Sequence, residues 1–123
     1  MSIDFIFQSN DNLLPRDEVR VEGIKTAPYP DGTRIHVEIT VTPFRERPNL
    51  EIEILDADDK IVSTASAIAI MNFRVALTMH LRGVTDSAGD YSVRVQLYYE
   101  DAAAPPDTHT AALNIPHAPP DRG

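Results

Sequence analysis

Three carboxylates in one short loop form the densest group of side chains that could do chemistry. Asp56, Asp58 and Asp59 separate two alternating apolar segments. Calcium is commonly coordinated by oxygen ligands at alternate positions of a loop. The same residues are equally typical of a hairpin turn, because Asp carboxylates accept hydrogen bonds from their own backbone. We favour the turn, and a calcium site is the alternative.

Four histidines offer imidazoles for a metal site or a general base. His36 and His80 lie on the polar faces of alternating segments, whereas His109 and His117 lie in a loop and in the tail. A catalytic histidine needs an orienting acid and a nucleophile beside it, in a site that excludes water. The flat outside of a sheet offers no such cavity. We therefore expect surface histidines, and we assign no catalytic, cofactor-binding or metal-ligating residue.

Two further groups suggest contacts with a ligand or partner. Arg45 and Arg47 offer positive charge for an anion, but no Gly-rich cradle or helix N-terminus accompanies them. Tyr98 and Tyr99 are adjacent, so one of them must point outward. With Arg94 on the same segment, that tyrosine could anchor an interface, since Tyr and Arg are enriched in binding hot spots.

The stretch 65–71 is apolar on both faces, uncharged and free of proline. As an exposed edge strand it would invite pairing with another chain. Either the N-terminal segment around Phe5 and Phe7 covers it, or it is an oligomer contact. We expect burial within the monomer, and a homo-oligomer through 65–71 is the alternative.

Composition excludes several classes of protein. The 123 residues contain no cysteine, which removes disulfides, zinc ribbons, iron–sulfur clusters and thiol nucleophiles. A net charge of −8 repels phosphate backbones and anionic lipids, so we expect neither nucleic acid nor membrane as a partner. The N-terminus lacks the basic start and long apolar run that mark an export signal. No segment approaches the roughly 20 apolar residues of a membrane span. We expect a cytoplasmic protein.

Period-two alternation of apolar and polar residues predicts an all-β fold. Four segments alternate clearly and are predicted as half-buried strands, namely 33–42, 50–54, 73–81 and 91–99. Weaker patterns predict strands at 3–7, 17–25 and 111–115. The pattern over 60–72 is ambiguous, because its phase flips between Ile70 and Phe73; a bulge, a bend between sheets or a short helical turn would each absorb one residue. We expect one domain over 1–116 and a flexible tail over 117–123.

Turns and charges fit this scheme. Asp31-Gly32 supplies a residue that tolerates positive φ between two strands. If 33–42 pairs with 72–82, His36 and Glu38 lie across from Arg74, His80 or Arg82. If 50–55 pairs with 91–100, Glu51 and Glu53 can face Arg94. Such cross-strand pairs contribute about 0.2–1 kcal/mol each, so strand charges need no functional explanation.

One motif resembles immunoglobulin-like domains. Their sixth strand begins with a small residue two positions before a tyrosine that closes a loop, as Gly89 and Tyr91 do here. Val93 stands where extracellular members have a cysteine, and both the cysteine pair and the buried tryptophan are absent. The resemblance implies an antiparallel two-sheet sandwich of about seven to eight strands.

A second resemblance bears on the calcium alternative. The run 50–58, which ends in Asp56-Ala57-Asp58, is similar to part of the synaptotagmin-type calcium- and phospholipid-binding sandwich. The further aspartate that this family carries several residues on has no counterpart between Lys60 and Thr64. The sequence therefore favours a non-enzymatic interaction or structural module of unknown partner, without a cofactor. The alternative is a calcium-dependent lipid- or ligand-binding sandwich that uses Asp56, Asp58 and Asp59.

Overall fold

In the computed structural model, the described residues are 13–82, 87–100 and 107–116. They form one short 3-10 turn, η1, and seven strands, whose bounds are Arg16–Glu18 for η1, then β1 Val21–Pro28, β2 Arg34–Val41, β3 Asn49–Leu55, β4 Ile61–Ala67, β5 Arg74–His80, β6 Gly89–Tyr98 and β7 Asp107–Ile115. No helix among them is long and apolar enough to cross a membrane.

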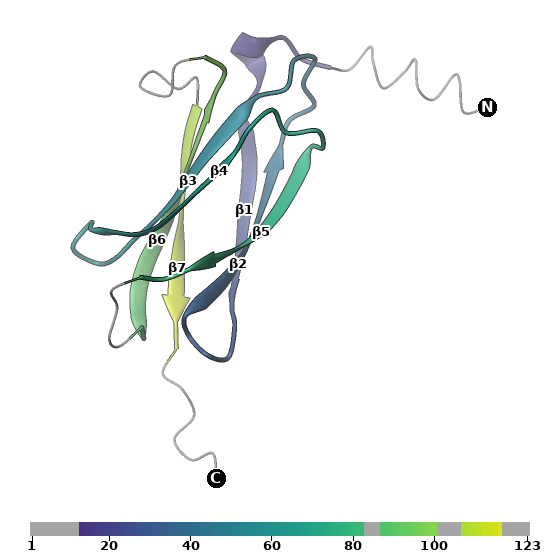
Figure 1. Cartoon of the computed structure of the whole chain (residues 1–123). Helices are drawn as coiled ribbons and strands as arrows, with labels where there is room; N and C mark the ends of the chain where they lie inside the picture. The colour runs from purple at the N-terminus through teal and green to yellow at the C-terminus, as the bar shows by residue number, and fades with distance from the viewer. Residues whose placement is uncertain (1–12, 83–86, 101–106, 117–123) are drawn as a thin grey trace.

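The strands form two antiparallel sheets that pack face to face (Figure 1). One sheet has the order β1-β2-β5 and the other the order β4-β3-β6-β7. Consecutive strands β4 and β5 belong to different sheets, as expected of a sandwich and not of a simple meander. The predicted immunoglobulin-like, all-β sandwich is confirmed, with seven strands in the described residues.

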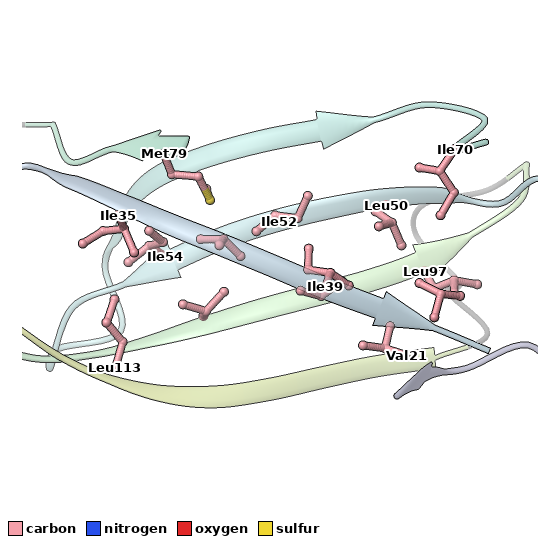
Figure 2. Close-up of a cluster of buried hydrophobic side chains, with 14 of the residues drawn as sticks. Val21, Ile35, Ile39, Leu50, Ile52, Ile54, Ile70, Met79, Leu97 and Leu113 are labelled. Atoms are coloured by element: carbon pink, nitrogen blue, oxygen red, sulfur yellow. The ribbon is translucent and has the colours of Figure 1, made fainter. Parts of the chain in front are cut away.

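The core lies between the sheets and is built from the alternating apolar positions. On β2, every second residue is buried, and β3 and β6 repeat the pattern. Figure 2 shows these side chains filling the space between the two layers. The fully buried side chains are Ile35, Ile39, Leu50, Ile52, Ile54, Met79, Leu97, Val19, Val37, Val41, Val93 and Val95. Each buried aliphatic side chain contributes about 1.5–3 kcal/mol relative to exposure.

The observed register tests the predicted charge pairs. Glu53 lies directly opposite Arg94, and the Arg94 Nε donates to Glu53 Oε1 at 2.9 Å. Arg74 Nε lies 3.4 Å from Glu38 Oε2. The predicted pairs of Glu53 with Arg94 and of Glu38 with Arg74 are confirmed, whereas Glu51 lies opposite Gln96 and not Arg94. His36 is different, because its direct partner is Thr78 and not a charged residue.

Two predicted strands have shifted starts. The first begins at Val21 instead of residue 17, because the backbone N–H of Glu18 donates to Pro15 O at 2.9 Å and closes a 3-10 turn. The last begins at Asp107 instead of residue 111, since β7 pairs along β6 as far as Leu97. The predicted strand at 3–7 and the tail 117–123 lie outside the described residues.

A bend between the sheets explains the phase flip before Phe73. Strand β4 ends at Ala67, and Ala69 takes a positive φ of 50°. The N–H of Ile70 then donates to Pro48 O at 3.0 Å, which directs the chain toward the other sheet. Of the three possibilities left open for this stretch, the structure shows two: this bend, and a register irregularity between Ile61 and Ser63 at the start of β4.

The strand that carries the tyrosine motif lies where the resemblance implies. Gly89 begins β6 with a φ of 138°, and Tyr91 two residues later is only 8% exposed. This conformation is one that glycine adopts far more readily than residues with a Cβ. The backbone conformation at residue 89 therefore explains why a glycine precedes the tyrosine.

Candidate interaction surface

The Asp56 turn connects β3 to β4 as a closed hairpin. One carboxylate oxygen of Asp56 accepts the backbone N–H groups of Asp58 and Lys60, each at 2.9 Å. The backbone closes as well, with Asp56 N donating to Lys60 O at 2.9 Å, while Asp59 takes a φ of 65°. Asp56 thus acts as a turn-forming residue, as the favoured interpretation expects. Across residues 13–82, 87–100 and 107–116, no three His, Asp or Glu side chains gather in a group that could hold a metal ion.

The other sequence candidates lie apart from one another. His80 is opposite Arg34, and His36 is opposite Thr78, on the outer face of the three-stranded sheet. Arg45 is exposed, and its Nε donates to Leu13 O at 3.2 Å. These contacts stabilise loops and strands. They assemble no nucleophile, base and acid in one place.

One polar cluster joins segments that are distant in sequence. The Arg16 guanidinium donates to Glu46 at 3.0 Å and to Glu100 at 3.1 Å, and it lies 4.7 Å from the centre of the Tyr99 ring. The Tyr99 hydroxyl donates to Glu46 O at 3.1 Å. The hydrogen bonds to Glu100 and Glu46 raise the pKa of Arg16, and the hydrogen bond from Arg16 lowers the pKa of Glu100. The cluster connects η1 to the loop before β3 and to the end of β6.

Strand β4 offers a different kind of feature, an edge without charge. It is the terminal strand of the four-stranded sheet, with β3 as its one neighbour. It lies within residues 61–73, the longest stretch of the chain without Asp, Glu, Lys, Arg or His. An edge strand presents unpaired backbone N–H and C=O groups that can pair with another strand.

The exposed apolar side chains gather on the same stretch. Within the described part of the chain, the large hydrophobic residues that are exposed are Ile61 at 45%, Ile68 at 65%, Met71 at 75% and Phe73 at 41%. All of them fall between residues 61 and 73. Phe73 also contacts the buried Phe44 edge-on, with ring centroids 4.9 Å apart. Exposed apolar side chains that cluster mark interaction sites more often than scattered ones do.

The remaining sheet edges carry features that discourage strand pairing. Strand β1 has a register irregularity at its start, a lysine at residue 25 and Pro28 at its end. Strand β5 begins with Arg74 and ends with His80. Strand β7 uses the carboxylate of Asp107 to accept the N–H of Val21 on β1 at 2.8 Å, across the two sheets. Charges, proline and bulges are the devices by which natural proteins protect edges. Strand β4 has no charge or proline, and its one register irregularity lies at its start, between Ile61 and Ser63.

A groove runs beside the first half of β4. Its volume is about 320 Å³, and it is lined by Ile61, Val62, Ser63, Thr64 and Arg82. The N–H of Arg82 donates to Val62 O at 2.9 Å, so the start of the edge is covered by the chain after β5. The part of β4 left for pairing runs from Ser63 to Ala67. We call residues 61–73, with this edge, the β4 surface.

Sequence reasoning found part of this surface. The stretch 65–71 was expected to be buried in the monomer, and the structure divides it: Ala65, Ala67 and Ile70 pack on the core, while Ile68 and Met71 are exposed. Covering by the segment around Phe5 and Phe7 lies outside the described residues. The contributions of Ile61 and Phe73 were missed, although the uncharged run from 61 to 73 was a visible signal.

Comparison with known proteins gives structural neighbours. No family model matches the chain, and no curated protein matches it. A glycosyl hydrolase family 2 member from Bacteroides cellulosilyticus superposes with a TM-score of 0.65 at 15% identity, over 79% of this chain and 15% of that one. A β-glucuronidase from Bifidobacterium dentium, complexed with coumarin-3-O-glucuronide, gives a TM-score of 0.62 at 16% identity, over 80% and 18%.

These comparisons concern the fold alone. The chain spans less than a fifth of the length of the two glycosidases. At such identities a shared architecture carries no activity with it, because one sandwich fold hosts many unrelated functions. The class defined by fold and surface is therefore an immunoglobulin-like sandwich with one uncharged edge.

Proposed function

We propose that this chain is a non-enzymatic interaction module that accepts an extended strand at the free edge of β4. The observation that carries the proposal is the β4 surface itself. It combines the longest uncharged stretch of the sequence with the exposed large hydrophobic side chains of the described residues. Addition of a strand to a sheet edge is a recurring mode of recognition, in which backbone hydrogen bonds supply affinity and side-chain contacts supply specificity.

The chemistry of the edge fits a strand better than a small molecule. Ser63, Ala65 and Ala67 face the core side of the sheet and are small, so an incoming strand meets no bulky side chain there. Thr64 and Ser66 face outward, and the Ser66 hydroxyl donates to Glu51 at 2.6 Å. The occurrence of similar folds as a small part of longer glycosidase chains is consistent with a module that works beside other units.

The test is selection of extended peptides from a displayed random library. Peptides selected on the whole chain should bind the Ala65→Lys variant at least about tenfold more weakly, because an inward-pointing lysine at the edge obstructs an added strand. Ala111→Lys is the matched control. Ala111 lies on β7, at the opposite edge of the same sheet, and it faces the buried Val93 as Ala65 faces the buried Ile52.

Two outcomes would contradict the proposal. One is a selection that yields no peptide binder. The other is a set of binders whose affinity falls equally in both lysine variants, which would indicate a general effect of the added charge.

A further inference from the structure

We infer that the strand accepted by this edge is β4 of a second copy of the chain, paired antiparallel about a two-fold axis. The inference rests on the proposed function, since it names the occupant of the same edge. In the resulting dimer, the two four-stranded sheets continue into one another across the seam. An interface of this kind is self-complementary, because a two-fold axis presents the same patch on both sides.

Net charge is the first argument for a second copy. Each chain carries a net charge of −8, so two copies repel through most of their surfaces. Residues 61–73 contain no ionisable side chain, so β4 itself brings no like charges into the seam. The neighbouring strand β3 places Glu51 beside Ser66, whose hydroxyl donates to it, and Glu53 beside Arg94, which neutralises it. Self-association is therefore least opposed at this edge.

Charge also sets the direction of pairing. The acidic turn with Asp56, Asp58 and Asp59 precedes β4, and Lys60 and Arg82 lie at the same end of the strand. A parallel arrangement would place two acidic turns side by side. An antiparallel arrangement places each turn beside the uncharged end of the partner strand, around Ile68, and separates the two turns by the length of the seam.

Antiparallel pairing of two β4 strands would place side chains of similar size opposite each other along the seam. In an antiparallel pair, residues directly opposite each other lie on the same face of the sheet. Small side chains from Ser63, Ala65 and Ala67 would meet their counterparts on the core side, and Thr64 and Ser66 would meet theirs on the outer side. Ile68 and Met71, at 65% and 75% exposure, extend beyond the strand and would cover the ends of the partner.

The experiment measures the mass of the full-length chain in solution. Light scattering after size exclusion, over roughly 1–500 μM protein, should show a concentration-dependent rise from the 13.6 kDa of one chain toward twice that mass. Ala65→Lys should remain a monomer over the whole range, and Ala111→Lys should dimerise as the wild type does. A second variant, Ile68→Asp with Met71→Asp, changes exposed side chains alone and should also be monomeric. Its control is Ala76→Asp with Ala112→Asp, at exposed alanines of β5 and β7.

The possible outcomes separate the inference from the proposed function. A wild-type chain that stays monomeric to the highest concentration overturns the second copy, while peptide binding at β4 would still support the strand-accepting edge. A dimer that survives both Ala65→Lys and the double aspartate variant overturns the β4 seam. A monomeric wild type that dimerises when residues 1–12 are deleted also overturns the inference, since the N-terminal segment would then be the occupant. Circular dichroism of each variant establishes folding. If Ala65→Lys does not fold, the test of the seam is the variant Ile68→Asp with Met71→Asp.

Discussion

At the scale of single residues, Asp31 and Gly32 form the turn between β1 and β2. One Asp31 oxygen accepts the N–H groups of Thr33 at 2.9 Å and Arg34 at 3.2 Å, and the other accepts the Arg34 Nε at 2.8 Å. Gly32 takes a φ of 73° and donates its N–H to Tyr29 O at 2.9 Å. The aspartate satisfies the backbone of the turn, and the glycine supplies its conformation.

Gly32→Ala should destabilise the protein by about 1–2 kcal/mol, because at positive φ a Cβ lies too close to the following carbonyl oxygen. The new Cβ would also lie 2.7 Å from the Ser87 Oγ, which must rotate away. Gly23→Ala is the control, since nothing lies within 4 Å of a Cβ there, and we expect it to be neutral or slightly stabilising. Denaturant unfolding of both variants measures the difference, and equal effects would contradict the argument.

Asp31→Asn tests the charge of the same turn through pH. The Thr33 N–H and the Arg34 guanidinium lower the pKa of Asp31 to about 2. A carboxylate with a depressed folded pKa stabilises the fold above its unfolded pKa of about 4, and this contribution is lost as pH falls toward 2. The difference in melting temperature between wild type and variant should therefore shrink from about pH 5 to about pH 2. A difference that stays constant over this range would show that the charge contributes nothing.

At the scale of elements, strands with strict apolar–polar alternation could be predicted from the sequence. Strand ends with polar, partly buried inward positions could not. The strands β2, β3, β5 and β6 were predicted because Ile, Val, Leu and Met occupy their inner positions in unbroken period two. The start of β7 was missed because Asp107 and His109 fill inward positions at its partly buried end. The Arg16 cluster was invisible, since its partners Glu46 and Glu100 are 30 and 84 residues away.

The β4 surface shows the same limit. The uncharged stretch was readable, and so was its potential for pairing. Whether a strand lies at the edge or in the middle of a sheet is decided by strand order, which depends on long-range packing. The exposure of Ile68 and Met71 follows from β4 lying at the end of the order β4-β3-β6-β7.

Calcium should leave the melting temperature unchanged, because the Asp56 Oδ1 already accepts two backbone N–H groups of its own hairpin. A cation held at a hundred times its dissociation constant would stabilise the fold by about 2.7 kcal/mol, which a thermal melt resolves easily. Melts with about 1 mM calcium and with a chelator make the comparison. A rise of several degrees with calcium would restore the alternative that uses Asp56, Asp58 and Asp59.

At the scale of the whole molecule, the first and last described strands are joined across the sandwich. Asp107 on β7 accepts the N–H of Val21 on β1, and the two residues are 86 positions apart. On the same side, Arg16 reaches Glu100 at the end of β6. The first contact connects the two sheets at the edges formed by β1 and β7, and the second connects η1 to the end of β6.

Asp107→Ala should destabilise the sandwich by about 1–3 kcal/mol, since it leaves a partly buried N–H without its acceptor. Asp107→Asn retains an acceptor oxygen and should lose less. Asp17→Ala, at an exposed residue of η1, should fall within about 0.5 kcal/mol of the wild type. Equal losses for the alanine and asparagine variants at residue 107 would exclude the hydrogen bond as the cause.

The bond between Val21 and Asp107 also has a consequence for folding during synthesis. The β1–β2 hairpin is complete once residue 41 has been made, yet β1 receives its contact with β7 only when residue 107 follows. At roughly 5–20 residues per second, about 3–13 s pass between completion of the hairpin and synthesis of residue 107. An isolated hairpin is marginally stable in water. The sandwich is therefore completed only when its last described strand has been made, and it folds on the millisecond-to-second scale of folds dominated by distant pairings.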